Sequence, residues 1–281
     1  MKQISDRATL RDGVTMPWLG LGLWRVEGQK TIDDAIRAAL DAGYTAFDTA
    51  TAYDNEEQIG RALHKLGVNR SDLFITTKLW NPQHVQGYDA CIEACKQSLA
   101  WLRLDVIDLY LIHWPVPSRG KTVEAWRALI QLQKEGLVRS IGVSNFHIHH
   151  LEMLERETGV IPSVNQVERH PWLNQRELID YCRAKNILVE AYSPLMRGHI
   201  KDEPVLAEIG DRHKKSAAQV VLRWHLQGGV ACIPKSVHAN RIQENAALFD
   251  FDLSDDEMAS IDALNRNRRL LPDPDKMDYC G

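Results

Sequence analysis

The chain has 281 residues, and its 34 Lys and Arg against 38 Asp and Glu give a formal net charge of −4. Nucleic-acid-binding proteins usually carry a basic surplus that neutralises phosphates, and this chain has none. No apolar run approaches the roughly 18 residues that cross a bilayer, and the first residues lack the apolar core of a signal peptide. Composition therefore predicts a cytoplasmic protein that acts on a small molecule, without nucleic-acid or membrane partners.

The five cysteines suggest neither a disulfide framework nor a metal site. They are few, odd in number and mostly far apart, whereas secreted disulfide frameworks are dense and usually even. Cys91 and Cys95 would share one helix face, but no second Cys or His pair at a matching spacing accompanies them. We expect structural roles for the cysteines.

The predicted elements alternate along the chain. An Asp-Gly pair at 12–13 predicts a β-hairpin first. Eight short apolar runs are then typical of buried strands: 18–24, 45–49, 73–78, 106–114, 140–145, 163–168, 188–193 and 230–236. Helical periodicity lies between them at 31–42, 56–66, 88–102, 123–135, 147–155, 174–184 and 216–227, and a capping box at Ser254 opens a last helix to about Arg266. Eight such units favour a single (β/α)8 barrel domain over residues 1–281, with the hairpin plugging its bottom.

Polar and aromatic residues follow the predicted strands where the loops of a barrel converge on one pocket. Singly, each has an ordinary structural explanation, such as a turn former or a solvated charge. Together, their placement at one end predicts a site. In chain order they are Trp24, Asp48, Tyr53, Lys78, Trp80, His113, Trp114, Ser144, Asn145, Gln166, Glu168, Tyr192, Ser193, Lys235 and Ser236.

The combination of Asp48, Tyr53, Lys78 and His113 indicates acid catalysis. A phenol with a pKa near 10 is a weak acid at neutral pH. A cation about 4 Å away at an effective dielectric near 20 contributes roughly 4 kcal/mol, about three pKa units before desolvation opposes it. We therefore expect Lys78 to make Tyr53 a usable general acid, with Asp48 offsetting the buried charge. Such a phenol protonates an oxygen that becomes negative as hydride arrives at a carbonyl carbon.

Several motifs resemble the signatures of aldo-keto reductases. They are Gly13-Val-Thr-Met-Pro17-Trp-Leu-Gly-Leu-Gly22, Asp48-Thr-Ala-Thr-Ala-Tyr53-Asp-Asn-Glu-Glu, Leu111-Ile-His113-Trp-Pro, Ile141-Gly-Val-Ser-Asn145-Phe and Ile233-Pro-Lys235-Ser236, the last followed by Arg241, Glu244 and Asn245. The resemblance covers nearly the whole chain. Short loops after Pro115 and Leu195 make it most similar to compact microbial members: diketogluconate reductases, glyoxal or methylglyoxal reductases and prostaglandin F synthase-like enzymes.

The resemblance implies a role for each matching residue. The catalytic tetrad would be Asp48, Tyr53, Lys78 and His113, with Tyr53 the acid and His113 orienting the substrate carbonyl. The NADPH/NADP+ site would comprise Ser144, Asn145 and Gln166 on the carboxamide, Tyr192 stacked on the nicotinamide, Ser193 and Leu195 along the pyrophosphate, Lys235, Ser236, Val237 and Arg241 at the 2′-phosphate, and Glu244 and Asn245 at adenine. The same resemblance favours a monomer.

Charged and aromatic residues in the sequence also predict the cofactor preference and the walls of the pocket. Lys235 and Arg241 provide two cations within one short segment, which suits the 2′-phosphate and predicts a preference for NADPH over NADH. Trp24, Trp80 and Trp114 are predicted walls of a pocket for small aldehydes, dicarbonyls and aromatic carbonyls. The cluster His147-Ile-His149-His150 has no neighbouring carboxylate or cysteine in the sequence, so no metal site is predicted.

Two other functions compete with a carbonyl reductase. A nucleotide-sensing subunit, resembling the ion-channel β subunits of this fold, would bind NADPH with negligible turnover, but the intact tetrad argues against it. A barrel metallohydrolase would need several His and carboxylate ligands at strand ends, where His113 is the only histidine. The sequence leaves open the physiological substrate, the direction of reaction and the role of residues 270–281.

Overall fold

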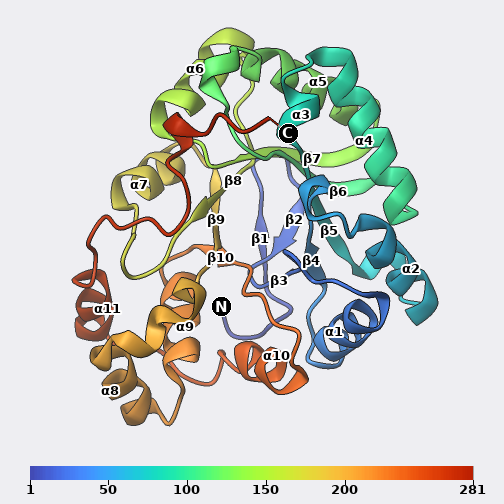
Figure 1. The fold of residues 1–281 in the computed structure, drawn as a ribbon. Helices are drawn as coiled ribbons and strands as arrows, with labels where there is room; N and C mark the ends of the chain where they lie inside the picture. Colours follow the sequence, from blue (N-terminus) through green and yellow to red (C-terminus); the bar gives the residue numbers. More distant parts are fainter. Residues whose placement is uncertain (281) are drawn as a thin grey trace.

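The computed structural model describes residues 1–280, and its centre is an eight-stranded parallel sheet rolled into a barrel (Figure 1). The sheet order runs from β10 to β3, so that every strand pairs with its neighbours in the chain. The strands are β3 Leu21–Gly22, β4 Ala46–Asp48, β5 Phe74–Leu79, β6 Ile107–Ile112, β7 Val138–Ser144, β8 Val164–Glu168, β9 Leu188–Tyr192 and β10 Ala231–Cys232. The predicted (β/α)8 barrel is therefore confirmed.

Backbone contacts between the first and last strands close the barrel. Gly22 bridges Lys235, and the Gly22 N–H donates to the Pro234 carbonyl at 3.1 Å. A Cβ on Gly22 would lie only 3.0 Å from the Ile233 carbonyl oxygen, so this approach requires glycine. The first and last strands, β3 and β10, are shorter than predicted; after β10, Pro234 has no N–H with which to continue the ladder.

Helices surround the barrel and bury its outer surface. They are α1 Gln29–Asp41, α2 Glu56–Leu66, α3 Asn81–His84, α4 Tyr88–Leu102, α5 Thr122–Lys134, α6 Ile148–Thr158, α7 Arg176–Ala184, α8 Pro204–His213, α9 Ala217–Gln227, α10 Ala239–Ala246 and α11 Asp255–Asp262. All predicted helices are present, whereas α3, α8 and α10 were not predicted. The last helix ends at Asp262 rather than near Arg266, because the Arg266 N–H instead donates to the Trp172 carbonyl at 3.0 Å.

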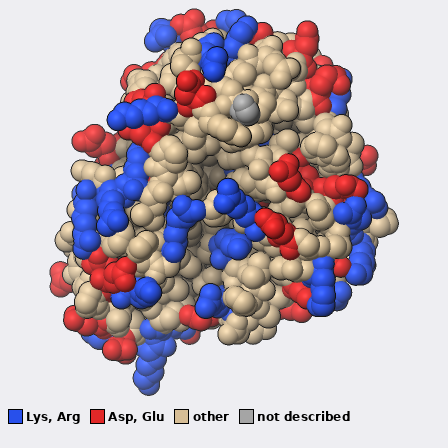
Figure 2. All heavy atoms as spheres, in the orientation of Figure 1, with Lys and Arg blue, Asp and Glu red and all other residues tan. Residues whose placement is uncertain are grey.

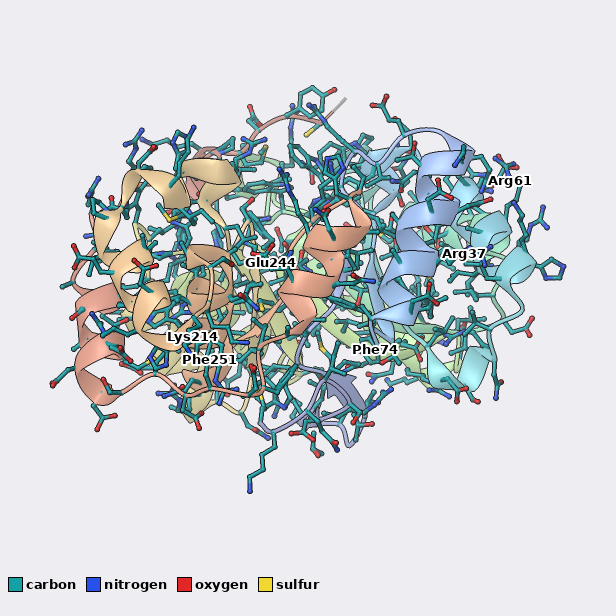
Figure 3. The ribbon with its side chains drawn as sticks, turned by 90° about the horizontal axis from the view of Figure 1, so that it is seen from below. Arg37, Arg61, Phe74, Lys214, Glu244 and Phe251 are labelled. Atoms are coloured by element: carbon teal, nitrogen blue, oxygen red, sulfur yellow. The ribbon has the colours of Figure 1, made fainter. Side chains whose placement is uncertain are left out.

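The predicted hairpin forms from β1 Arg7–Thr9 and β2 Thr15–Pro17. Its buried Leu10 and Met16 pack with residues near the strand starts, including Phe74 and Val164. The Asp12 carboxylate also accepts hydrogen bonds from the Ser140 and Ser163 hydroxyls, at 2.6 and 2.9 Å. The hairpin thus covers the bottom of the barrel, opposite the C-terminal segment (Figure 3).

After α11 the chain returns across the top of the barrel (Figure 1). The Glu168 carboxylate accepts hydrogen bonds from the backbone N–H groups of Leu270 and Leu271, at 2.5 and 3.2 Å. Farther along, the Asn81 side chain donates to the Tyr279 carbonyl at 2.8 Å. Residues 270–280 therefore lie at the same end as the predicted site. Among residues 1–280, no helix is long and apolar enough to cross a membrane.

Candidate active site

A cavity of about 730 Å³ opens at the carboxyl ends of the strands. Figure 2 shows this face hollowed at its centre, with basic side chains around the hollow. The cavity brings together most of the predicted site. Predicted residues that line it are Trp24, Asp48, Tyr53, Trp80, His113, Trp114, Ser144, Asn145, Gln166, Tyr192, Ser193 and Lys235. Others that do not line it are Lys78, Leu195, Ser236, Val237, Arg241, Glu244 and Asn245.

Lys78 is fully buried at the cavity floor, where three oxygen atoms surround its ammonium group. Nζ lies 2.6 Å from Asp48 Oδ1, 2.8 Å from the Thr49 carbonyl oxygen and 3.4 Å from the Tyr53 hydroxyl. Burial, the largest single influence, lowers the pKa of Lys78, but the combined attractions of Asp48, Tyr53 and Glu190 make the net direction upward. The site therefore holds a permanent cation beside the phenol, as the sequence predicts.

The effect of that cation on Tyr53 differs from our expectation. Burial raises the pKa of Tyr53, and Asp48 raises it further, so that the lowering by Lys78 does not prevail. The lowering by Lys78 that we expected is present, but desolvation, whose size the sequence does not give, and the carboxylate behind the lysine exceed it. The phenol is consequently protonated at neutral pH, which is the form that a general acid must have.

His113 faces the same space from the end of β6. Its ring centroid lies 5.7 Å from that of Tyr53 and 5.0 Å from that of Trp80. Burial, reinforced by Lys78, holds the pKa of His113 well below its usual value. The imidazole is therefore neutral, and one ring nitrogen can donate a hydrogen bond to a carbonyl oxygen.

A buried carboxylate that was not predicted, Glu190 on β9, lies behind the tetrad. The Gln166 side-chain amide donates to Asp48 Oδ2 at 2.8 Å and to Glu190 Oε2 at 2.7 Å. Burial and the charge of Asp48 raise the pKa of Glu190 to about 8. Glu190 lies inside a run interpreted only as buried strand, so its sole sequence signal was an acidic residue in an apolar segment. With both N–H groups of Gln166 engaged, its carbonyl oxygen is free to accept another hydrogen bond.

A polar cluster next to Gln166 contains Ser144 and Asn145, the other two predicted carboxamide contacts. The Tyr192 hydroxyl donates to Asn145 Oδ1 at 2.6 Å, while Asn145 Nδ2 donates to the His113 carbonyl at 2.9 Å. Ser144 Oγ accepts from the same amide at 3.1 Å. Asn145 adopts a φ of 66°, a left-handed conformation that Asn tolerates and that turns its side chain back across the barrel end. These four groups thus hold one another in place.

Basic residues surround the cavity mouth. Lys235 is exposed at its rim, and the guanidinium groups of Arg25 and Arg197 lie over the Trp24 ring, 5.0 and 4.9 Å from its centroid. The two arginines were not predicted; both have positive φ, in loops without a periodic pattern. Such a rim attracts an anionic ligand.

Beyond the cavity, α10 and the loop before it carry the predicted adenosine-phosphate contacts. Arg241 is exposed, Asn245 is buried, and the Glu244 carboxylate accepts a hydrogen bond from the Ser216 hydroxyl. Figure 3 shows Glu244 on α10. Ser236 is buried, and its hydroxyl accepts from the His238 N–H at 3.1 Å.

The walls of the cavity are aromatic and partly built by the C-terminal segment. The Trp80 ring lies 6.0 Å from that of Tyr279, and Leu271, Pro272 and Met277 also line the space. Trp114 is buried beneath His113, whereas Trp24 and Trp80 are partly exposed. The sequence left the role of the C-terminal residues open, and the structure shows that this segment lines the cavity.

Comparison with known proteins identifies the class to which this fold and site belong. A model of the aldo/keto reductase family matches residues 18–266. The glyoxal reductase of Bacillus subtilis (strain 168) is 49% identical over 274 residues, covering 98% of each chain. The methylglyoxal reductase DkgA of Escherichia coli (strain K12) is 49% identical over 269 residues, covering 95% of this chain and 96% of its own.

A solved structure shows the same similarity in three dimensions. The crystal structure of a Gox0644 mutant in complex with NADPH has a TM-score of 0.92 and 41% identity, covering 98% of this chain and 99% of its own. The chain therefore belongs to the aldo/keto reductase family, and it is an NADP-dependent oxidoreductase.

Proposed function

We propose that this protein reduces small aldehydes and ketones to alcohols with NADPH, and that dicarbonyls such as glyoxal and methylglyoxal are among its substrates. The observation that carries the proposal is the Tyr53 hydroxyl at the floor of an aromatic-walled cavity, 3.4 Å from the ammonium group of a fully buried Lys78. The relatives named glyoxal reductase and methylglyoxal reductase support this substrate class.

In the proposed mechanism Tyr53 protonates the substrate oxygen. The neutral His113 donates a hydrogen bond that places the carbonyl oxygen near the phenol. As negative charge develops on that oxygen, Tyr53 releases its proton to it, and Lys78 stabilises the resulting phenolate. Asp48 holds Lys78 in position and compensates its charge in a buried environment.

The residues present suit NADPH, which supplies the hydride when bound. Ser144, Asn145 and the free carbonyl oxygen of Gln166 offer the donors and acceptors that a carboxamide needs, and the Tyr192 ring lies beside them. Ser193 and Leu195 would follow the pyrophosphate, where Arg197 adds a cation.

Farther out, the exposed charges of Lys235 and Arg241 suit the 2′-phosphate together with Ser236 and Val237. Glu244 and Asn245 would contact adenine. Since charge-assisted contacts to the 2′-phosphate are absent with NADH, we expect NADPH to be preferred.

The cavity walls define the proposed substrate range. Trp24, Trp80, Trp114 and Tyr279 offer flat apolar surfaces, while the acid and His113 supply the polar contacts for a carbonyl oxygen. Such a pocket accepts dicarbonyls and aromatic aldehydes and binds one carbonyl oxygen specifically.

The direct test follows the loss of NADPH absorbance with methylglyoxal, a diketone and an aromatic aldehyde, with NADH in parallel. Tyr53→Phe should lower kcat by roughly 10²- to 10⁴-fold, the usual contribution of a general acid, and leave the Kd for NADPH unchanged. Tyr181→Phe on α7 is the matched control, with activity expected at the wild-type level. Wild-type turnover by Tyr53→Phe would exclude this tyrosine as the acid.

A further inference from the structure

Three histidines at the start of α6 meet two aspartates of the C-terminal segment, outside the cavity just described. His147 Nε2 lies 3.3 Å from Asp273 Oδ1, and His149 Nε2 lies 3.1 Å from Asp275 Oδ1. His150 Nε2 is also 3.3 Å from Asp275 Oδ1. In the sequence alone these histidines have no neighbouring carboxylate, and no metal site was predicted. The fold supplies two carboxylates, from a segment more than a hundred residues farther along the chain.

Two groups of three ligand atoms are each close enough to hold an ion. The nitrogen of His147 and the carboxylate oxygens of Asp273 and Asp275 lie within 4.8 Å of one another, as do the corresponding atoms of His149, His150 and Asp275. Asp275 belongs to both groups and connects them. Imidazole nitrogens combined with carboxylate oxygens are typical ligands of Zn²⁺, Co²⁺ and Ni²⁺, whereas Ca²⁺ and Mg²⁺ prefer oxygen alone.

His150 has a different role from His147 and His149, because its Nδ1 is already engaged in a hydrogen bond. Its Nδ1 accepts a hydrogen bond from the His147 backbone N–H at 3.1 Å, which places the ring proton on Nε2. That buried Nε2–H points toward Asp275 but makes no well-directed hydrogen bond. A small shift of the Asp275 carboxylate toward a metal would let it accept a hydrogen bond from this N–H. His150 would then orient the ligand Asp275 without binding the metal itself.

Charge in the cluster favours a cation. Asp273 Oδ1 is held in place by the Asp275 backbone N–H at 3.1 Å and by His147 Nε2 at 3.3 Å. His150 is buried, and its ring centroid lies 4.0 Å from that of His149. The positive end of α6 and the nearby Arg269 oppose a bare cation, and two carboxylates at the ligand positions offset them.

We propose that His147, His149, Asp273 and Asp275 form a binding site for a divalent transition metal of the Zn²⁺ class, which fastens the C-terminal segment to α6. A metal at this site would affect the cavity wall, because the residues on either side of the two aspartates line the cavity. Leu271 and Pro272 precede the two aspartates, Met277 and Tyr279 follow them, and all four line the cavity. A metal at this site therefore stiffens one wall of the cavity without touching the tetrad.

The test is calorimetric titration of the full chain with ZnCl₂ in a non-chelating buffer, and it does not depend on the proposed activity. The wild type should bind about one equivalent, reversibly on addition of a chelator, and its Tm should rise by several degrees. MgCl₂ should produce neither effect. His149→Ala and Asp275→Asn should each lose the saturable binding.

Two control variants separate this site from other metal-binding groups. His199→Ala removes an exposed histidine that pairs with Asp202 at 2.9 Å elsewhere on the surface, and Cys280→Ser removes the partly exposed thiol of the tail. Both should bind Zn²⁺ as the wild type does. Loss of binding in a control, or wild-type binding by Asp275→Asn, would overturn the proposal, as would no binding at millimolar Zn²⁺.

The fastening of the tail has a separate readout. Saturating Zn²⁺ should slow amide hydrogen exchange in residues 270–280 of the wild type and leave it unchanged in Asp275→Asn. If Zn²⁺ binds but exchange in the tail stays at its metal-free rate, the ion does not hold the segment, and that part of the proposal is wrong.

Discussion

Replacing Glu190 by glutamine tests the electrostatics behind the proposed acid. Glu190 is buried, accepts a hydrogen bond from Gln166, and has its pKa raised to about 8 by burial and Asp48. The Glu190→Gln variant keeps the size of the side chain and an oxygen that can accept from Gln166, but it cannot ionise. Any difference in pH dependence between the two proteins therefore reports the carboxyl proton.

The sign and size of the effect follow from the two pKa values. Between the ordinary value of 4.5 and about 8, the folded protein retains a proton on Glu190 that the unfolded chain has released. The free energy of unfolding consequently decreases as pH rises across this interval and levels off above it. At 1.36 kcal/mol per unit, three pH units would give about 4 kcal/mol, and partial titration at both ends of the interval reduces the decrease between pH 5 and pH 8 to about 3.5 kcal/mol. The variant lacks this decrease.

Urea unfolding of both proteins at several pH values from 5 to 8 measures the difference. The variant should match the wild type near pH 5 and exceed its stability by about 3.5 kcal/mol at pH 8. Glu177→Gln, an exposed position on α7, should give a difference that does not change with pH. A constant difference for Glu190→Gln as well would refute a protonated Glu190 in the folded protein.

Three further substitutions address the rest of the site. Lys78→Met should destabilise the protein by about 3–5 kcal/mol in urea unfolding, because it leaves Asp48 buried and unpaired; adding Asp48→Asn should restore much of the loss. Arg241→Ala should weaken NADPH binding roughly tenfold or more by fluorescence titration, as expected for a charge-assisted hydrogen bond, and leave NADH binding unchanged. Tyr279→Ala should raise the KM for an aromatic aldehyde but not the Kd for NADPH, because this ring faces Trp80 in the outer wall of the cavity.

The barrel could be predicted because its signal repeats. A buried strand and an amphipathic helix alternate eight times, and each strand end then places its polar residues at one rim. The helices that were missed do not belong to this repeat. In α8, for example, Leu206 and Ile209 pack with Val220 and Trp224 of α9, and so few apolar residues produce no periodic signal of their own.

Interactions across the barrel were harder to predict than positions around its rim. The sequence indicated that Lys78 and Tyr53 share one end, but not that burial outweighs their attraction in setting the pKa of the phenol. Glu190 shows the same difficulty, because its closeness to Asp48 depends on the register of strands that are far apart in the chain. Charged side chains inside a barrel interact across its centre. The distance between two such charges cannot be derived from how far apart their strands are in the sequence.

The C-terminal segment marks where sequence patterns no longer suffice. It has little periodicity, and its path is set by contacts with side chains that lie far back in the chain: Glu168 holds its start, the histidines of α6 hold its middle, and Asn81 holds its end. His147-Ile-His149-His150 lacks a carboxylate ligand among its neighbours in the sequence. The fold brings Asp273 and Asp275 to it from the C-terminal segment. Parts of the site built from strand ends can be predicted from their repeat, whereas the wall that shapes the substrate pocket depends on where a nonperiodic tail crosses the barrel mouth. Under the proposed function, substrate selectivity would therefore depend on a segment whose path is set by distant residues and not by its local sequence.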